Sequence, residues 1–295
     1  MKPAPFDYAA PDSLPASLSL IAAYGDDGKL LAGGQSLVPA LNFRLLQPSV
    51  LIDLNRVTEL AGITRTAAGG LRLGAMTRQA QVERSPLTAQ LAPLLAETMP
   101  QIAHPQIRNR GTIGGSMVHA DPAAELPVAA VALDAVFEIA GEGGVRRVPA
   151  KSFFQSLFTV DITPDEILTA VEFPPWPART GGAFVEVARR RGDYALAGVA
   201  VVVTLDDAGK CARARIVYLN LGDGPIDAEG AAGLLQNELL TLAAIEAAAD
   251  FGATQEIAPA GNIHATPDFQ RHLARVLTRR ALSTAAARAK ESQNG

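Results

Sequence analysis

Cysteine is nearly absent from this chain of 295 residues, which contains only Cys211. One cysteine cannot close an intrachain disulfide, and it cannot supply the thiolates that hold an iron–sulfur cluster or a structural zinc ion. The sequence therefore excludes these sites from this chain acting alone. The four histidines are spread along the chain, so no metal-binding triad is expected among His104, His119, His264 and His272.

Long apolar runs and a surplus of basic residues are also missing. No run approaches the length of a membrane span, and the start, MKPAPFDYAAPDS, has no apolar signal-peptide core. We therefore expect a cytoplasmic protein with no membrane span. The net charge is −4 and the basic residues are scattered, except for Arg189, Arg190 and Arg191, so nucleic acid is not an expected partner.

The length and the hydrophobic content of 48% are sufficient for two globular domains. The segment FPPWPARTGG, residues 173–182, contains three prolines and two glycines and is the clearest linker in the chain. We place the domain boundary near residue 177. The expected parts are residues 1–176, residues 177–285 and a tail at 286–295.

The first part contains helix and strand signals in alternation. Ser13 as N-cap and Gly25 as stop predict a short amphipathic helix between them. Further along, we expect strands at 29–32, 49–54 and 71–75 and helices at 77–84 and 86–99. The pattern indicates a mixture of α and β structure.

The second part begins with strand signals and ends with helix signals. The segments 181–190, 197–205 and 211–222 predict three strands, and the turn DDAGK at 206–210 favours a hairpin between the last two. Long helical patterns follow at 238–252 and 268–290. We expect this part to serve as scaffold and subunit contact.

Two turns, AGGQS at 32–36 and TIGGS at 112–116, each contain paired glycines beside small polar residues. Glycine permits positive φ and lets a ligand approach backbone N–H groups, so two such turns could hold a pyrophosphate. The nearby Asp121 and Glu125 would suit ribose or ribityl hydroxyls. A single Gly-Gly pair is typical of an ordinary turn, however, and neither segment fits the common phosphate-binding motifs. The residues alone leave both alternatives open.

Two longer segments carry a resemblance to a known family. AGGQSLVPALNFRLLQPSVLIDLNRV and HPQIRNRGTIGGSMVHADPAAELP resemble the flavin-binding segments of the molybdenum hydroxylases, which include xanthine dehydrogenase and carbon monoxide dehydrogenase. The similarity is to the medium, FAD-carrying subunit, continues through DEIL and RRRGDYALAGVAVVVTL, and covers residues 1 to about 285. It implies an α+β fold, in which a PCMH-type FAD-binding domain of two subdomains precedes an α+β domain with a small antiparallel sheet and helices.

The resemblance also implies which residues contact FAD. Glu125 matches the family's acid that hydrogen-bonds the cofactor, and Asp121 is a weaker candidate for that role. Ile102 and Leu168 match apolar or backbone contacts, and Tyr194 falls where the family brings a residue close to the flavin ring. The first loop comprises Leu31, Ala32, Gly33, Gly34, Gln35, Ser36, Leu37 and Val38, and the second comprises Thr112, Ile113, Gly114, Gly115 and Ser116.

Other residues leave alternatives open. Many relatives carry a lysine just before the arginine run, where this chain has Val185 and Glu186, so a lysine contact to the flavin is in doubt. Arg108 and Arg110 suit phosphate, a partner subunit or a purely structural role. His104 suits the flavin site or a loop.

The resemblance implies an FAD-carrying electron-transfer subunit with noncovalent FAD and no catalytic residue of its own. The molybdenum cofactor would lie in a large partner subunit and two [2Fe–2S] clusters in a small one, in a heterotrimer or a dimer of heterotrimers. Electrons would pass from the clusters through FAD to an external acceptor. The alternatives are a stand-alone flavin-dependent oxidase acting on its own small-molecule substrate, and a binding module that carries no flavin.

Overall fold

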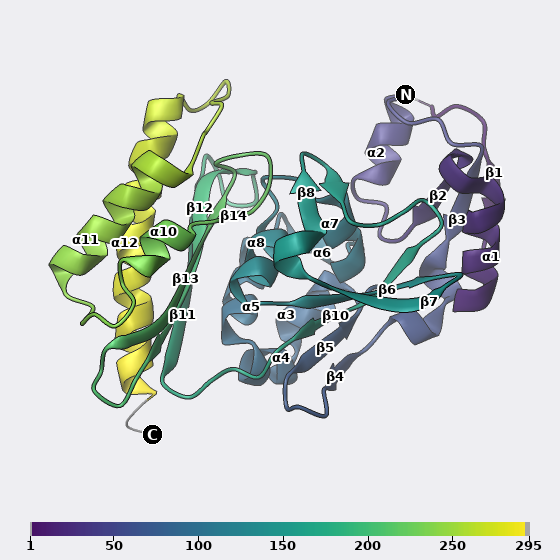
Figure 1. The fold of residues 1–295 in the computed structure, drawn as a ribbon. Coiled ribbons are helices and arrows are strands. Elements are labelled where there is room, and N and C mark those ends of the chain that lie inside the picture. Colours follow the sequence, from purple (N-terminus) through teal and green to yellow (C-terminus); the bar gives the residue numbers. More distant parts are fainter. Residues whose placement is uncertain (1, 293–295) are drawn as a thin grey trace.

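The computed structural model describes residues 2–292, and its N-terminal subdomain is built on a small parallel sheet (Figure 1). Strands β1 (Asp7–Ala9), β3 (Val50–Asp53) and β2 (Gly28–Leu31) are neighbours in that order. Helix α1 (Leu14–Tyr24) packs on this sheet, and the short helix α2 (Leu37–Asn42) follows β2. The expected helix between Ser13 and Gly25 and the expected strands near 29–32 and 49–54 are confirmed, whereas β1 was missed.

The second subdomain contains a five-stranded antiparallel sheet in the order β4-β5-β10-β6-β7. Its central strand is β10, which belongs to the segment that leads into the linker. Of these strands the sequence predicted only the one at 71–75. The strands are β4 (Ile63–Arg65), β5 (Leu71–Gly74), β6 (Val136–Gly141), β7 (Gly144–Pro149) and β10 (Ile167–Phe173), and a separate hairpin contains β8 (Phe154–Ser156) and β9 (Thr159–Val160).

Short helices cover this second sheet. The helix expected at 86–99 is in fact two helices, because Pro93 has no N–H to continue the first one and starts the second. The helix expected at 77–84 begins at Gln79. The helices are α3 (Gln79–Arg84), α4 (Pro86–Leu91), α5 (Pro93–Thr98), α6 (Pro105–Arg108), α7 (Ile113–His119), α8 (Glu125–Ala132) and α9 (Ala150–Phe153).

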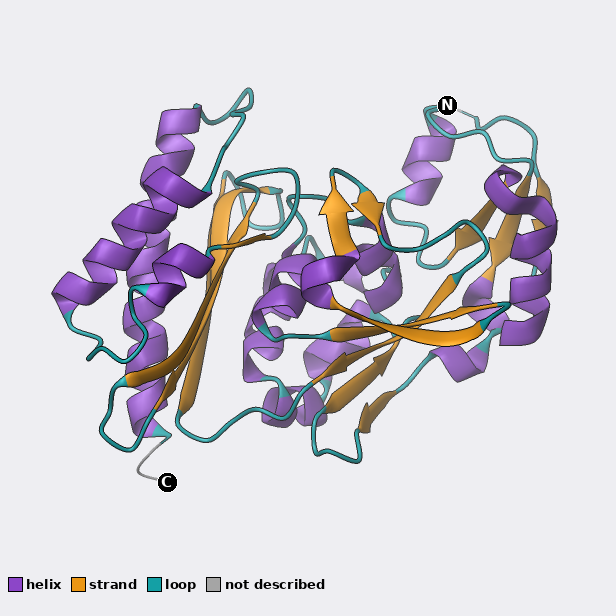
Figure 2. Cartoon of the chain, in the orientation of Figure 1, coloured by secondary structure: helices purple, strands orange, loops and turns teal. Residues whose placement is uncertain are grey.

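The C-terminal domain is an antiparallel sheet covered on its outer face by helices (Figure 2). The three predicted strands are confirmed, and a short fourth strand was missed. The helix expected from residue 238 begins only at Leu242, where the Thr241 side chain accepts a hydrogen bond from Ala244 N–H. The elements are β11 (Thr180–Ala188), β12 (Ala195–Leu205), β13 (Cys211–Leu219), β14 (Ile226–Asp227), α10 (Glu229–Gly233), α11 (Leu242–Phe251) and α12 (Pro267–Glu291).

Helix α12 packs along β11 and β12 and continues past residue 285. Ala289 is fully buried, and Gly181 lets the helix approach because a Cβ there would overlap the Ala285 carbonyl oxygen. Residues 286–291 of the expected tail therefore form part of this helix. Residues 293–295 lie outside the described residues.

The inner face of the C-terminal sheet packs directly on the second subdomain. Phe184 and Ala200 of this sheet share one hydrophobic core with Leu94 of α5 and Val128 of α8. Apolar burial at this junction stabilises the packing of the two domains, since each square ångström contributes about 25 cal/mol. The two domains therefore hold α8 next to β12 and β13, and α5 next to β11.

Candidate functional site

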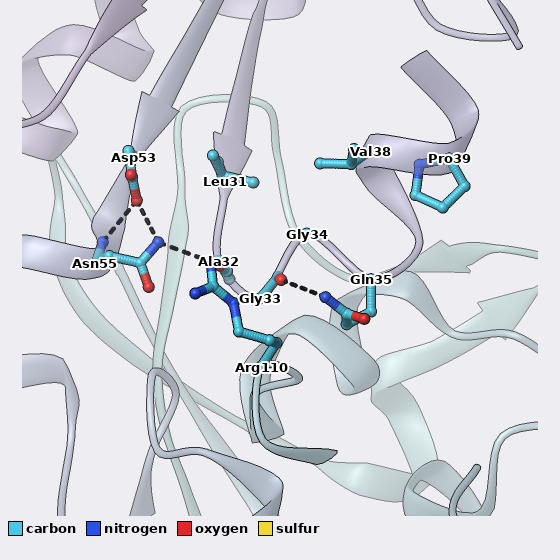
Figure 3. A pocket seen from close by; sticks show the side chains of 10 residues that line it. All are labelled: Leu31, Ala32, Gly33, Gly34, Gln35, Val38, Pro39, Asp53, Asn55 and Arg110. Atoms are coloured by element: carbon cyan, nitrogen blue, oxygen red, sulfur yellow. Dashed lines mark hydrogen bonds between the residues drawn. The ribbon is translucent and has the colours of Figure 1, made fainter. Parts of the chain in front are cut away.

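The first glycine turn forms one wall of a pocket of about 380 Å³ (Figure 3). Strands β2 and β3 run parallel and end at the same edge, so the turn after Leu31 lies beside Asp53 and Asn55. The pocket is lined by Leu31, Ala32, Gly33, Gly34, Gln35, Val38, Pro39, Asp53, Asn55 and Arg110. Ser36 and Leu37, which the resemblance placed in the same loop, follow Gln35 at the start of α2.

Backbone N–H groups in this turn are available for a ligand. From Gly33 to Leu37, none of them donates a hydrogen bond to a partner within residues 2–292. Gly34 has φ +73°, a left-handed conformation that glycine adopts without a steric penalty. Consecutive free N–H groups around a left-handed residue form a concave site for anionic oxygens.

At Gly33, close packing requires glycine, whereas at Gly34 the backbone conformation does. A Cβ at Gly33 would lie 2.5 Å from the carbonyl oxygen of Arg110 and 2.8 Å from Cα of Gly111. The first turn therefore touches the segment that leads into the second turn. The bare backbone at Gly33 permits this contact between two parts of the protein.

Arg110 supplies positive charge to the pocket. Its side chain lines the pocket and makes no hydrogen bond or ion pair within the described part of the chain. The guanidinium of Arg78 lies close by, since burial and the charge of Arg110 lower the pKa of Arg78. Two guanidinium groups favour an anionic ligand at this place.

The neighbouring polar side chains fix the two loops. Asn55 donates to the Ala32 carbonyl (3.0 Å), and Arg78 donates to both the Asn55 side chain and the Arg110 carbonyl. Asp53 accepts a hydrogen bond from Tyr8 (2.6 Å). Burial opposes the charge of Asp53, but the hydrogen bonds from Tyr8 and Asn55 outweigh it and hold the pKa of this carboxyl below its usual value.

Arg108, by contrast, has a structural role. It is buried, pairs with Glu83 at 2.8 Å and donates to the Ile102 carbonyl at 2.7 Å. His104 is exposed and lies against Gly192, where a Cβ would overlap its ring. Of the two arginines that the sequence left open, only Arg110 faces the pocket.

The second glycine turn is held by hydrogen bonds inside the protein. Thr112 caps helix α7, and its hydroxyl accepts from Gly115 N–H (3.1 Å). Gly114 N–H donates to the Ala75 carbonyl (2.8 Å), and a Cβ on Gly114 would lie 2.6 Å from the Ala75 Cβ. Both N–H groups therefore have partners within the protein, and their expected contact with pyrophosphate stays a prediction.

The second turn still lies next to the first. A Cβ on Gly115 would be 3.7 Å from the Ala32 Cβ, so these two turns form adjacent walls. A contact of FAD with other atoms of Thr112, Ile113 or Ser116 stays a prediction.

Ile102 and Leu168 are buried in the main hydrophobic core. Leu168 precedes Thr169, whose carbonyl accepts from Ala75 N–H (2.9 Å), and Ala75 in turn supports Gly114. The structure therefore connects β10 to the second turn but does not bring Ile102 or Leu168 to the lining of the pocket.

The acidic residues gather at the junction of the two domains. Glu125 begins helix α8 and is 6% exposed, and burial raises its pKa to about 7. Glu186 on β11 has a pKa raised to about 8 by burial and by the charge of Glu125. Tyr194 is exposed, and partial desolvation together with Asp121 and Glu125 raises its pKa, so its side chain lies near these two acids.

Sequence reasoning missed several residues of the site. Asp53 is the last residue of β3 and Asn55 follows the strand expected at 49–54, so the rule that ligands bind at the carboxyl ends of parallel strands could have identified both. The sequence singled out Glu186 only because many relatives carry a lysine just before the arginine run. Within residues 2–292 there is no group of three metal-ligating side chains, and no helix there is long and apolar enough to cross a membrane.

Comparison with known proteins decides the family. Residues 4–176 match the family described as the FAD binding domain in molybdopterin dehydrogenase, and residues 182–285 match the CO dehydrogenase flavoprotein C-terminal domain. The chain belongs to the FAD-binding medium subunits of the molybdenum hydroxylase family. FAD is the cofactor of this family's N-terminal domain, and the free N–H groups and Arg110 fit its diphosphate.

Several relatives cover nearly the whole chain. The 6-hydroxypseudooxynicotine dehydrogenase complex subunit alpha of Paenarthrobacter nicotinovorans is 45% identical over 99% of this chain and 98% of that protein. The solved carbon monoxide dehydrogenase of Hydrogenophaga pseudoflava is 38% identical, with a TM-score of 0.94 over 98% of this chain and 99% of that one. Quinoline 2-oxidoreductase from Pseudomonas putida 86 gives 37% identity and a TM-score of 0.92, with coverage of 98% and 99%. The predicted fold class is confirmed.

Proposed function

We propose that this chain binds FAD noncovalently, with the diphosphate in the pocket of the first glycine turn. The observation that carries this proposal is that Gly33, Gly34 and Gln35 line the pocket together with Arg110, and that neither their N–H groups nor the Arg110 guanidinium has a partner within residues 2–292. Each hydrogen bond to a charged oxygen contributes about 1.5–3 kcal/mol. Several of them are sufficient to hold a dianionic diphosphate without a covalent link.

The remaining contacts follow from the site and the family. Leu31, Val38 and the second turn would flank the diphosphate, and Asn55 and Arg78 would keep the two loops in place. The carboxyls of Asp121 and Glu125 would accept hydrogen bonds from hydroxyl or N–H groups, and Tyr194 would lie near the ring. Ile102 and Leu168 would support these loops from the core.

We further propose that the chain is an electron relay within a larger complex. The bound flavin supplies the redox chemistry, and the protein holds and orients it. A small subunit with two [2Fe–2S] clusters would deliver electrons, which leave for an external acceptor, and a large subunit would hold the molybdenum cofactor. Only Cys211 is available as a cysteine here, which fits clusters held by another chain.

Substrate choice would then belong to the large subunit. Relatives are named for 6-hydroxypseudooxynicotine, carbon monoxide, nicotine and quinoline, although their FAD-binding chains are 36–45% identical to this one. The two domains of this chain, 1–176 and 177–285, would serve this one function, the first binding FAD and the second completing the site and contacting partners.

The test compares the isolated FAD-loaded chain with the assembled complex. Under anaerobic conditions, carbon monoxide, quinoline and 6-hydroxypseudooxynicotine should leave the flavin absorbance of the isolated chain unchanged. In the assembled complex, addition of its own substrate should bleach the flavin absorbance. In a complex rebuilt with the flavin-free chain, the same substrate should reduce the clusters, and no flavin signal should change. Rapid flavin bleaching in the isolated chain would instead support a stand-alone oxidase.

A further inference from the structure

Three consecutive arginines lie on the loop that joins β11 to β12. Arg189, Arg190 and Arg191 are all exposed, and none of them forms an ion pair within residues 2–292. The chain as a whole carries a net charge of −4, so this loop concentrates positive charge on an acidic protein. Exposed charges of one sign without partners attract ligands of the opposite sign.

Neighbouring groups do not neutralise this charge. Asp193 lies in the same loop, but its carboxylate forms no ion pair within the described part of the chain, and its N–H donates to the Arg190 carbonyl (3.1 Å). Nη1 of Arg189 lies 3.1 Å and 3.4 Å from the two ring nitrogens of His264. An imidazole nitrogen can accept this hydrogen bond but supplies no negative charge. The loop therefore stays positively charged.

Close packing against the FAD-binding domain anchors the loop. Gly192 has φ +88°, and a Cβ there would overlap the His104 ring and lie 3.0 Å from the Ala103 carbonyl oxygen. Glycine tolerates both this φ and this contact. The arginines are therefore presented from an anchored turn at the junction of the two domains.

Two large exposed side chains flank the arginines. Tyr194 follows them in the loop and is 69% exposed, and Ile263, next to His264, is 93% exposed. Arginine and tyrosine are enriched at protein–protein interfaces. None of these residues lines the pocket of the first glycine turn. We call Arg189, Arg190, Arg191, Tyr194, Ile263 and His264 the basic patch.

The composition and the position of the basic patch favour a protein as its ligand. Small molecules bind in concave sites that enclose them, whereas these side chains are exposed to solvent. Short-lived electron-transfer complexes use small interfaces, below about 1,200 Å², which suits a patch of few residues. The proposed function places the flavin ring near Tyr194, so a protein bound to the patch would lie close to that ring.

We infer that the basic patch docks an acidic one-electron carrier protein, and that this carrier is the external acceptor. The inference rests on the proposed function and specifies the acceptor that it leaves open. Two electrons leave the reduced flavin one at a time, each reduces one oxidised carrier molecule, and two protons pass to solvent. The arginines speed the encounter by attracting the acidic surface of the carrier.

Binding is tested with zinc-substituted rubredoxin, an acidic carrier protein that transfers no electron in this form. The FAD-loaded full chain should bind it at low salt. Its affinity should fall as the ionic strength rises from about 0.02 M to about 0.5 M, because salt screens exposed charges. The double variant Arg190→Gln plus Arg191→Gln should bind about fivefold or more weakly at low salt.

A second double variant controls for net charge. Arg280→Gln plus Lys290→Gln removes the same charge from exposed positions on α12 and should retain the wild-type affinity. No binding to the wild type, or an equal loss of affinity in the two double variants, overturns the inference.

Stopped-flow oxidation of the reduced, FAD-loaded chain compares iron-containing rubredoxin with cytochrome c, a basic carrier protein. At low salt, the double variant at Arg190 and Arg191 should react about fivefold or more slowly with rubredoxin but no more slowly with cytochrome c. Equal slowing with both carriers would mean that the arginines act on the flavin and not on the carrier, which also overturns the inference.

The assembled complex distinguishes a carrier from a further subunit. Zinc-substituted rubredoxin should bind the complex as it binds the isolated chain. Binding to the isolated chain alone would mean that a subunit covers the basic patch, and overturns the inference. A wild type that binds no FAD would instead overturn the proposed function. Because binding of zinc-substituted rubredoxin can be measured on flavin-free chain as well, the two failures are distinguishable.

Discussion

At the scale of single residues, carboxyl groups of two kinds determine how stability depends on pH. Arg146 donates hydrogen bonds to Glu166 and holds the pKa of that carboxyl at about 2. Glu125 and Glu186 have pKa values raised to about 7 and about 8. The ordinary value for a glutamate in the unfolded chain is about 4.3.

The two kinds act in separate pH ranges. Glu166 stabilises the fold above its unfolded pKa, and this contribution is lost as the pH falls toward about 2. Glu125 and Glu186 bind protons more tightly in the folded state, so stability falls as the pH rises from about 4.3 through about 8. The flavin-free chain should therefore be most stable near about pH 4–5.

Urea unfolding of flavin-free protein at several pH values tests whether the free energy of unfolding falls as the pH rises. Glu186→Gln should reduce the loss of unfolding free energy between about pH 5 and about pH 8.5 by about 1–3 kcal/mol, because the amide stays neutral. Glu142→Gln, at an exposed position, should leave that loss unchanged. A wild type whose stability rises through this range would contradict the assignment.

At the scale of structural elements, glycine residues in the two turns have different tasks. Gly34 and Gly25 both have positive φ, +73° and +51°, but only Gly34 lines the pocket. Gly114 has negative φ and lies against Ala75, where helix α7 meets the end of β5. Substitutions at these positions separate ligand binding from folding.

Alanine substitutions at the three glycines should give three results. Gly25→Ala and Gly34→Ala should each destabilise the chain by about 1–2 kcal/mol through strain at positive φ, but only Gly34→Ala should weaken FAD binding. Gly114→Ala should lower the melting temperature of flavin-free protein, because overpacking costs about 1–3 kcal/mol. Melting curves and FAD titration measure both effects, and equal FAD affinity in Gly25→Ala and Gly34→Ala would show that the first turn does not face the cofactor.

Local sequence signals predicted the elements that carry strong caps and turns. Ser13 and Gly25 correctly bounded α1, and the apolar pattern with the 206–210 turn correctly indicated the hairpin of β12 and β13. The strand β10 was missed because its pairing with β5 and β6 joins residues far apart in sequence. The hairpin of β6 and β7 is local, and the glycine-rich turn at 141–144 could have indicated it. The break at Pro93 could have been read from the proline itself.

The site was predictable only in part for the same physical reason. The first glycine turn is a local feature that the sequence singled out, and in the structure it lines the pocket. That Gly33 touches Arg110 and that Gly114 N–H is already bonded to Ala75 depends on tertiary packing. Likewise, Glu125 and Glu186 are brought together only by the packing of two domains.

At the scale of the whole molecule, the C-terminal sheet is packed between helices of both domains (Figure 1). Helix α12 covers one face, and α5 and α8 of the FAD-binding domain contact strands of this sheet. The diphosphate pocket lies in the first domain, and the acidic cluster lies at the junction. Packing of the two domains therefore forms the acidic cluster, whereas the pocket belongs to the first domain alone.

The most direct measurement is calorimetric titration of the flavin-free full chain with FAD, in the wild type, Arg110→Gln and Arg280→Gln. The wild type should bind one FAD, and Arg110→Gln should bind about tenfold or more weakly, because it loses a charge-assisted hydrogen bond of about 1.5–3 kcal/mol. Arg280→Gln, at an exposed position on α12, should match the wild type. A wild type that binds no FAD, or equal affinities in the two variants, would contradict the assignment of this pocket to the diphosphate.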